Sequence, residues 1–168
     1  MNSYHIEGPW PGQLAIVPRP RGGDWPADEV LNLKDQGFDI LLSLLTEAES
    51  QELGLAREAD LSRTNALKYF SFPIPDLGVP DSAPKAQQFV SELHRALMTG
   101  KKVAVHCRQG IGRSGLIAAS LLVVSGMNPE SAFRQVSVAR GLPTPETAEQ
   151  ANWVLQLARE FAESLVRR

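Results

Sequence analysis

The 168-residue sequence contains a single cysteine, Cys107. It therefore has no intramolecular disulfide and no structural zinc site built on two or more cysteines, which excludes a small secreted fold held by disulfide bridges. An excess of charge of one sign is also lacking, because 17 basic and 19 acidic residues leave a formal net charge of −2. Since nucleic-acid-binding domains are normally strongly basic, we expect no nucleic-acid partner.

Long hydrophobic runs are missing as well. The most apolar stretch, residues 116–124, is far shorter than the ~20 residues that a membrane-spanning helix needs. The first ten residues lack the basic and apolar pattern of a leader, so we expect no membrane anchor and a cytoplasmic protein. The length, with 43% hydrophobic and 21% charged residues, is typical of a compact chain. We predict one domain over residues 1–168 and a monomer.

Short apolar runs alternate with amphipathic stretches along the chain. Runs typical of buried strands are residues 13–17, 38–45, 68–74 and 102–106. Stretches typical of helices are residues 27–36, 84–99, 116–124, 129–140 and 146–166, while the charged segment 46–66 is expected at the surface with one or two short helical turns. This order predicts a single α/β domain with a central, mostly parallel twisted sheet flanked by helices on both faces.

The most informative segment follows the predicted strand at 102–106. It reads Cys107-Arg108-Gln109-Gly110-Ile111-Gly112-Arg113-Ser114-Gly115 and leads into an apolar helix. In a glycine-rich loop between a strand and a helix, backbone N–H groups can turn toward an anion at the positive end of the helix dipole. Gly110 and Gly112 allow the positive φ values and the close approach that such a loop requires. Arg113 can grip two oxygens of a phosphoryl group with its planar guanidinium.

The loop therefore predicts a phosphate site that carries its own nucleophile. We assign phosphate binding to six consecutive residues, Arg108, Gln109, Gly110, Ile111, Gly112 and Arg113. A lone cysteine is most often a packed core residue, but Cys107 ends a strand and precedes this loop. We expect it to be a thiolate at neutral pH, because helix N-termini and nearby cations favour that form.

The pattern His-Cys-x5-Arg-Ser-Gly at residues 106–115 resembles the signature of the protein tyrosine phosphatase superfamily. Within it, the chain is similar to the small atypical dual-specificity phosphatases that consist of a catalytic domain alone. Three further segments resemble the family's opening, its acid loop and the start of its last helix, namely residues 11–14, 74–76 and 145–150. The resemblance thus covers nearly the whole chain. It implies that Cys107 forms a phosphocysteine intermediate and that Arg113 binds the phosphate.

The resemblance also implies roles for neighbouring residues. Asp76 would be the general acid, which protonates the leaving oxygen and then activates water. Asp81 is the alternative acid, although its place before a predicted helix suits a capping or first-turn carboxylate. Ser114 would donate to the sulfur of Cys107 as it leaves, and it also suits a helix start that satisfies free backbone donors. We expect His106 to orient the loop.

These assignments predict a cysteine-dependent phosphomonoesterase that hydrolyses phosphotyrosine, and through a shallow pocket phosphoserine and phosphothreonine, on phosphorylated proteins. We expect no metal and no cofactor, because Arg113 and the backbone amides stabilise the transferred phosphoryl group. One alternative is a phosphoinositide or sugar phosphatase of the same superfamily, but the loop offers only Arg108 as an additional cation. Another is a non-catalytic phosphate-binding module, which is disfavoured because the cysteine, the arginine and the acid are all present.

This chain departs from the family pattern at one position. Phosphatases specific for phosphotyrosine place a water-positioning glutamine at the start of the last helical segment, where this sequence has Glu146. Gln150 is at best a partial substitute. The sequence therefore leaves open which residue positions the hydrolytic water.

Overall fold

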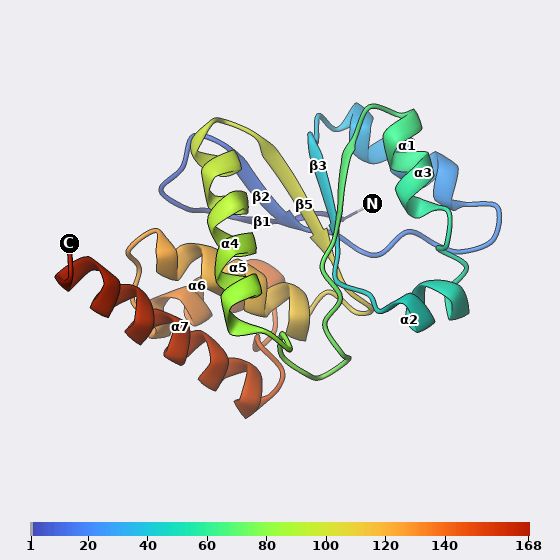
Figure 1. Ribbon diagram of the computed structural model, residues 1–168. Helices are drawn as coiled ribbons and strands as arrows, with labels where there is room; N and C mark the ends of the chain where they lie inside the picture. The colour runs from blue at the N-terminus through green and yellow to red at the C-terminus, as the bar shows by residue number, and fades with distance from the viewer. Residues whose placement is uncertain (1) are drawn as a thin grey trace.

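The computed structural model describes residues 2–168, which form five strands and seven helices (Figure 1). The strands are β1 (Tyr4–Ile6), β2 (Gln13–Ile16), β3 (Ile40–Ser43), β4 (Lys68–Ser71) and β5 (Lys102–His106). The helices are α1 (Pro26–Asp35), α2 (Glu47–Glu52), α3 (Glu58–Thr64), α4 (Ala83–Met98), α5 (Gly112–Val124), α6 (Pro129–Arg140) and α7 (Ala148–Val166). The strands form one sheet in the order β1-β2-β5-β3-β4, in which β1 is antiparallel to β2 and all other neighbours are parallel.

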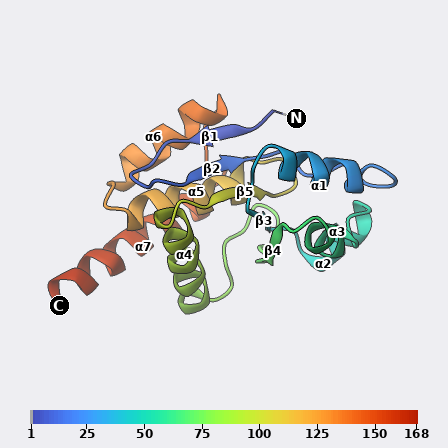
Figure 2. The ribbon, with the colours of Figure 1, turned by 90° about the horizontal axis from the view of Figure 1, so that it is seen from above.

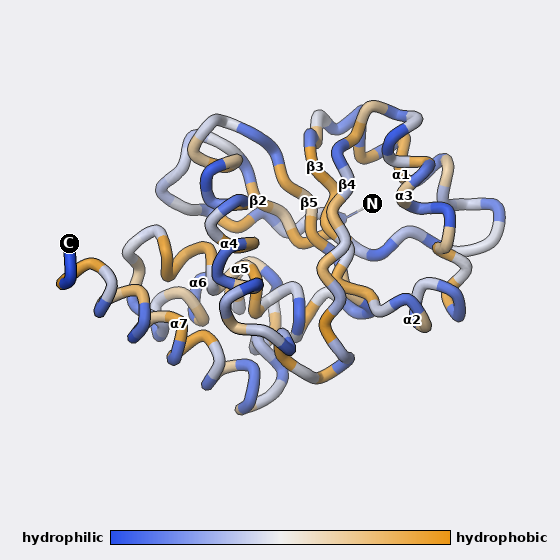
Figure 3. Tube along the Cα trace, in the orientation of Figure 1, coloured by the Kyte–Doolittle hydropathy of each residue, from blue (hydrophilic) through white to orange (hydrophobic). Residues whose placement is uncertain are grey.

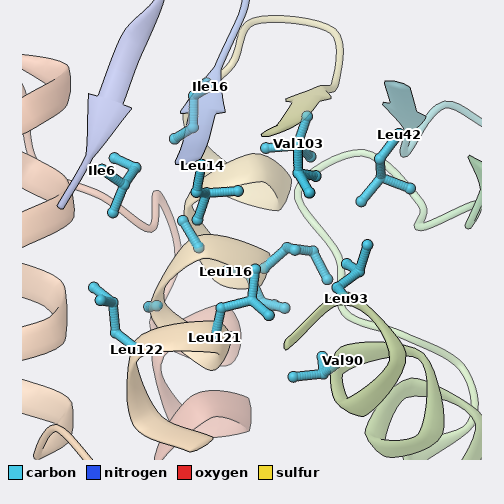
Figure 4. Packing of buried hydrophobic residues seen from close by; sticks show 14 of the residues in the cluster. Ile6, Leu14, Ile16, Leu42, Val90, Leu93, Val103, Leu116, Leu121 and Leu122 are labelled. Atoms are coloured by element: carbon cyan, nitrogen blue, oxygen red, sulfur yellow. The ribbon is translucent and has the colours of Figure 1, made fainter. Parts of the chain in front are cut away.

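The central strands are mostly apolar because both faces of the sheet are covered. Side chains alternate between the faces of a strand, so Val103 and Val105 of β5 join the core cluster that contains α5, while Ala104 joins the cluster that contains α1. In β3, Leu42 likewise joins the first of these clusters and Leu41 joins the second. Figure 4 shows the first cluster, with side chains of β2, β3 and β5 facing those of α4 and α5.

Helices α4, α5, α6 and α7 pack on one face of the sheet, and α1 and α3 cover the other (Figure 2). Helix α5 is buried from Gly112 to Val123, as expected for a helix that is apolar nearly all round, and it appears mostly orange and white in Figure 3. The arrangement confirms the predicted α/β class with helices on both faces. No helix within residues 2–168 has the length and apolar character needed to cross a bilayer.

Several predicted elements differ in detail. Strand β1 was not predicted, because three residues carry too little pattern, and it forms by pairing Tyr4 with Ile16 and Ile6 with Leu14. The strand expected over 68–74 ends at Ser71, close to Pro73, which lacks a backbone N–H for the ladder. The last helix starts at Ala148 rather than at residue 146, after an N-cap at residue 147.

The parallel strands determine where the chemistry gathers. Strands β3, β4 and β5 run in the same direction side by side, so their carboxyl ends lie at one edge of the sheet. Cys107 follows β5, helix α2 follows β3, and the loop with Asp76 follows β4. Open α/β sheets bind ligands in the crevice outside this edge.

Candidate active site

The loop after β5 surrounds the sulfur of Cys107, which is buried with only 3% of the residue exposed. Gly110, at φ +69°, donates its backbone N–H to Sγ at 3.2 Å. Four other backbone N–H groups of this loop have no protein acceptor among residues 2–168. They belong to Arg108, Gln109, Ile111 and Gly112. Because these donors cluster before the N-terminus of α5, the loop is suited to bind an oxyanion.

Arg113 lies in the first turn of α5 and is buried, with 1% exposed. Its Nη1 donates to Oε2 of Glu49 at 2.7 Å and to the carbonyl of Ile74 at 2.8 Å, and its Nη2 donates to Oε1 of Glu49 at 2.9 Å. Burial alone would lower the pKa of Arg113, but the bond to Glu49 and the charges of Cys107, Glu49 and Asp76 raise it. The guanidinium is thus a permanent cation held in one orientation.

Glu49 is the main site residue that the sequence did not reveal. It lies on α2 and closes a capping box with Thr46, whose backbone N–H donates to Oε2 of Glu49 at 3.0 Å. Burial acts to raise the pKa of Glu49, but the hydrogen bonds from Arg113 and Thr46 outweigh it and lower the pKa to about 2. The Thr-x-x-Glu spacing signals the cap, yet no local signal points to Arg113. The segment 46–66 contains the short helical turns that were predicted, as α2 and α3, but it is not confined to the surface, because Glu49 is buried.

Asp76 lies beside Arg113, as the acid-loop resemblance implies. Its Oδ1 accepts from Nη2 of Arg113 at 3.1 Å and from the backbone N–H of Leu77 at 3.1 Å. The side chain is 53% exposed, so it faces both the cation and solvent. This position combines access to a substrate with a fixed orientation toward the phosphate site.

Asp81, the alternative acid, lies elsewhere. It is exposed and directly precedes Ser82, the N-cap of α4, whose hydroxyl accepts from the backbone N–H of Lys85 at 3.5 Å. The capping role expected for Asp81 is therefore taken by Ser82. The structure brings Asp76, and not Asp81, into contact with Arg113.

His106 is fully buried beneath the loop and contacts a second carboxylate that the sequence did not reveal. Its Nε2 lies 2.7 Å from Oε1 of Glu58, a residue of α3 with 1% exposed. Oε2 of Glu58 accepts from the hydroxyl of Tyr69 at 3.2 Å, and burial together with the charge of Glu58 raises the pKa of Tyr69. His106 thus connects the phosphate loop to α3 through a buried polar chain.

Ser114 follows Arg113 and is fully buried. Its hydroxyl has no hydrogen-bond partner within residues 2–168. The hydroxyl is therefore not engaged in satisfying the free donors of the helix start, which was one of its two expected roles. The donor of this buried hydroxyl is thus not committed to another protein group in the described chain.

Two arginines support the loop from outside. Nη2 of Arg108 lies 2.9 Å from Oε1 of Glu52, and this hydrogen-bonded pair lowers the pKa of Glu52. The Arg108 side chain therefore points to α2. Arg140, which the sequence did not single out, donates Nε to the carbonyl of Gly110 at 2.7 Å and Nη2 to that of Gln109 at 3.2 Å. Because Arg140 holds these two carbonyls away from the loop centre, the adjoining N–H groups stay free to bind an anion.

Comparison with known proteins gives consistent matches. The family described as the DSP-PTPase phosphatase of polymorphic toxin systems matches residues 17–127. Cyclin-dependent kinase inhibitor 3 of Rattus norvegicus is 28% identical over 132 residues, covering 77% of this chain and 62% of that protein. Tyrosine-protein phosphatase yvh1 of Schizosaccharomyces pombe is 33% identical over 142 residues, covering 80% and 37%. The chain thus spans less than two thirds of the length of these relatives.

Solved structures agree with the fold. Kinase associated phosphatase, carrying serine in place of its catalytic-site cysteine, superposes with a TM-score of 0.80 at 23% identity and covers 89% of this chain and 88% of its own. Tk-PTP in its active form superposes with a TM-score of 0.76 at 25% identity and covers 94% and 96%. Both similarities therefore cover most of this chain.

Proposed function

Because this chain belongs to the DSP-PTPase phosphatase family, we propose that it is a cysteine-dependent phosphomonoesterase acting on phosphotyrosine, phosphoserine and phosphothreonine in proteins. The observation that carries the proposal is the juxtaposition at the carboxyl edge of the sheet. Sγ of Cys107 lies among free backbone donors, and Arg113 is fixed beside it with Asp76 in contact. These positions support the assignment of nucleophile, phosphate ligand and acid to one site.

In the first step, the thiolate of Cys107 attacks the phosphorus atom of the substrate. The S–P bond forms while the bond from phosphorus to the ester oxygen breaks, and Asp76 in its acid form gives its proton to that oxygen. The loop N–H groups and the guanidinium of Arg113 stabilise the charge on the three remaining phosphoryl oxygens. Asp76 is left as a carboxylate.

In the second step, water attacks the phosphorus of the phosphocysteine. A new O–P bond forms, the S–P bond breaks, and the proton of the water passes to the Asp76 carboxylate. Cys107 leaves as a thiolate, to which the Ser114 hydroxyl donates. This role is supported by the position of Ser114 directly after Arg113 and by its buried hydroxyl, which has no hydrogen-bond partner within residues 2–168 and so is not committed elsewhere.

The setting of the enzyme forms part of the proposal. We propose a monomer that acts in the cytoplasm on phosphorylated proteins. A reducing compartment keeps the nucleophile, the only cysteine of the chain, out of oxidised forms. The names of the relatives, a tyrosine-protein phosphatase and a kinase inhibitor, support a substrate within protein phosphorylation.

The test compares the wild-type protein with Cys107→Ser in the hydrolysis of p-nitrophenyl phosphate in buffer containing EDTA, followed by phosphotyrosine, phosphoserine and phosphothreonine peptides. We expect metal-independent activity of the wild type, complete loss in the variant and release of phosphate from all three peptides. A folded but inactive wild type that still binds inorganic phosphate would identify a phosphate-binding module. A strict metal requirement would contradict the mechanism.

A further inference from the structure

The turn that carries the acid is strained. Residues 75–78 form a tight turn closed by a hydrogen bond from the N–H of Gly78 to the carbonyl of Pro75 at 2.8 Å. Leu77 occupies it with φ +60°, a left-handed conformation that glycine and asparagine favour and leucine avoids. Its side chain is 55% exposed, so packing of Leu77 does not compensate. Such strain persists only where the surroundings hold the backbone in place.

Two side chains at the start of α7 contact this turn, and one of them is the hydroxyl of Thr147, which donates to the carbonyl of Leu77 at 3.5 Å. The side-chain amide of Gln150 is fully buried, and its Nε2 donates to the carbonyl of Gly78 at 3.1 Å. Its Oε1 accepts from the backbone N–H groups of Glu146 at 3.1 Å and Thr147 at 3.3 Å. One amide thus fixes its own helix start with its oxygen and the acid turn with its nitrogen.

The same amide lies against the phosphate loop. A Cβ atom added at Gly112 would come within 2.8 Å of Oε1 and 2.9 Å of Nε2 of Gln150. Gln150 therefore sits between the loop that binds phosphate and the turn that bears Asp76. It connects the two halves of the site alongside the direct contact between Arg113 and Asp76.

We propose that Gln150 is a positioning residue that holds Asp76 in place for proton donation to the leaving oxygen. This inference rests on the proposed function, in which Asp76 is the acid. It assigns Gln150 to the first chemical step. The two hydrogen bonds accepted by Oε1 fill that oxygen, so the bonds present favour a tie to the turn over the binding of hydrolytic water.

The principal test replaces Gln150 by Glu, which keeps the acceptor for the helix start and loses the donor to Gly78. The values of kcat/KM are measured for p-nitrophenyl phosphate, whose leaving group needs little protonation, and for phenyl phosphate, whose leaving group needs it strongly. Because general acid catalysis contributes about 10²–10⁴-fold, a displaced acid should reduce the rate on phenyl phosphate at least ~10-fold more than on p-nitrophenyl phosphate. A merely structural role would reduce both rates equally, and equal losses overturn the proposal.

Two double variants sharpen the result. In an Asp76→Asn background, Gln150→Glu should produce no further difference between the substrates, because the acid is already absent. Adding Leu77→Gly to Gln150→Glu should recover part of the lost rate on phenyl phosphate, since glycine adopts a positive φ without strain. Persistence of the substrate difference without Asp76, or no recovery with Leu77→Gly, contradicts the proposal.

The competing role is separated by pre-steady-state kinetics. If Gln150 positions the water, the variant releases a burst of p-nitrophenol and then turns over slowly, and this outcome overturns our proposal. Should Gln150→Glu fail to fold, Gln150→Met, which is similar in size and uncharged, takes its place in the same assays. Failure of the proposed function is recognised separately, because the wild type would then be inactive or Cys107→Ser would retain full activity.

Discussion

Arg113 and Glu49 form a bidentate ion pair, with Nη1 2.7 Å from Oε2 and Nη2 2.9 Å from Oε1. The pair joins the first turn of α5 to α2, and the carbonyl of Ile74 accepts a further bond from Nη1 at 2.8 Å. These bonds fix the plane of the guanidinium before an oxyanion arrives. Preorganised charge of this kind is the main source of electrostatic catalysis.

Arg113→Lys tests this arrangement. A lysine has no planar fork and cannot pair with both oxygens of Glu49 while it binds a phosphoryl group in a fixed orientation, so we expect kcat to fall by about 10²–10³-fold, as for the loss of an oxyanion donor. Initial rates with p-nitrophenyl phosphate measure the effect. Arg108→Lys is the matched control, because the Arg108 side chain pairs with Glu52 at the surface, and it should change the rate only a few-fold. Equal losses in both variants would contradict the special role of Arg113.

Glu49 makes stability depend on pH in a defined direction. Its pKa is lowered from 4.5 to about 2 in the folded protein, so the folded state favours the carboxylate. The corresponding stabilisation, on the order of 3 kcal/mol, is fully present above pH 4.5 and is lost as the pH falls toward 2. Urea unfolding of wild type and Glu49→Gln should therefore give free energies that converge between these pH values. A constant difference down to pH 2 would contradict the ion pair.

The parts of the site that are contiguous in the chain were predictable, and the parts that meet across the fold were not. Cys107, Gly110 and Arg113 share one strand–loop–helix segment whose spacing alone indicates an anion site. Glu49 is 64 residues from Arg113. Its capping box with Thr46 is visible in the sequence, but the ion pair exists only because β3 and β5 are neighbours.

The elements of the fold likewise differ in whether the sequence alone predicts them. Strands such as β3 and β5 are short, mostly apolar runs and were predicted because burial on both faces leaves that pattern. Strand β1 has three residues and depends on the edge of β2 for its hydrogen bonds. The sequence likewise identifies Gln150 only as a residue near a helix start. Its bond to Gly78 could not be predicted, because it requires the packing of α7 against the acid loop.

The two candidate acids provide a matched pair of variants. Asp76→Asn should lower the rate on phenyl phosphate by about 10²-fold or more at neutral pH, because the leaving oxygen loses its proton donor. Asp81→Asn should leave the rate within about two-fold, since Asp81 lies exposed before α4 and general acid catalysis requires hydrogen-bond reach. Steady-state kinetics on both variants checks the assignment. A larger loss for Asp81→Asn would transfer the acid role to that residue.

The buried carboxylate of Glu58 should contribute strongly to stability. His106 and Glu58 are both excluded from solvent and lie 2.7 Å apart, so removal of Glu58 leaves the imidazole of His106 and the hydroxyl of Tyr69 without this partner, at about 1–3 kcal/mol for each group. Glu58→Ala should lower the free energy of unfolding by the sum of these two costs in urea titrations. Tyr69→Phe removes only the hydrogen bond to Oε2 of Glu58 and should cost about 1–2 kcal/mol. If the two variants were equally stable, His106 would be held by its packing under the phosphate loop rather than by the carboxylate.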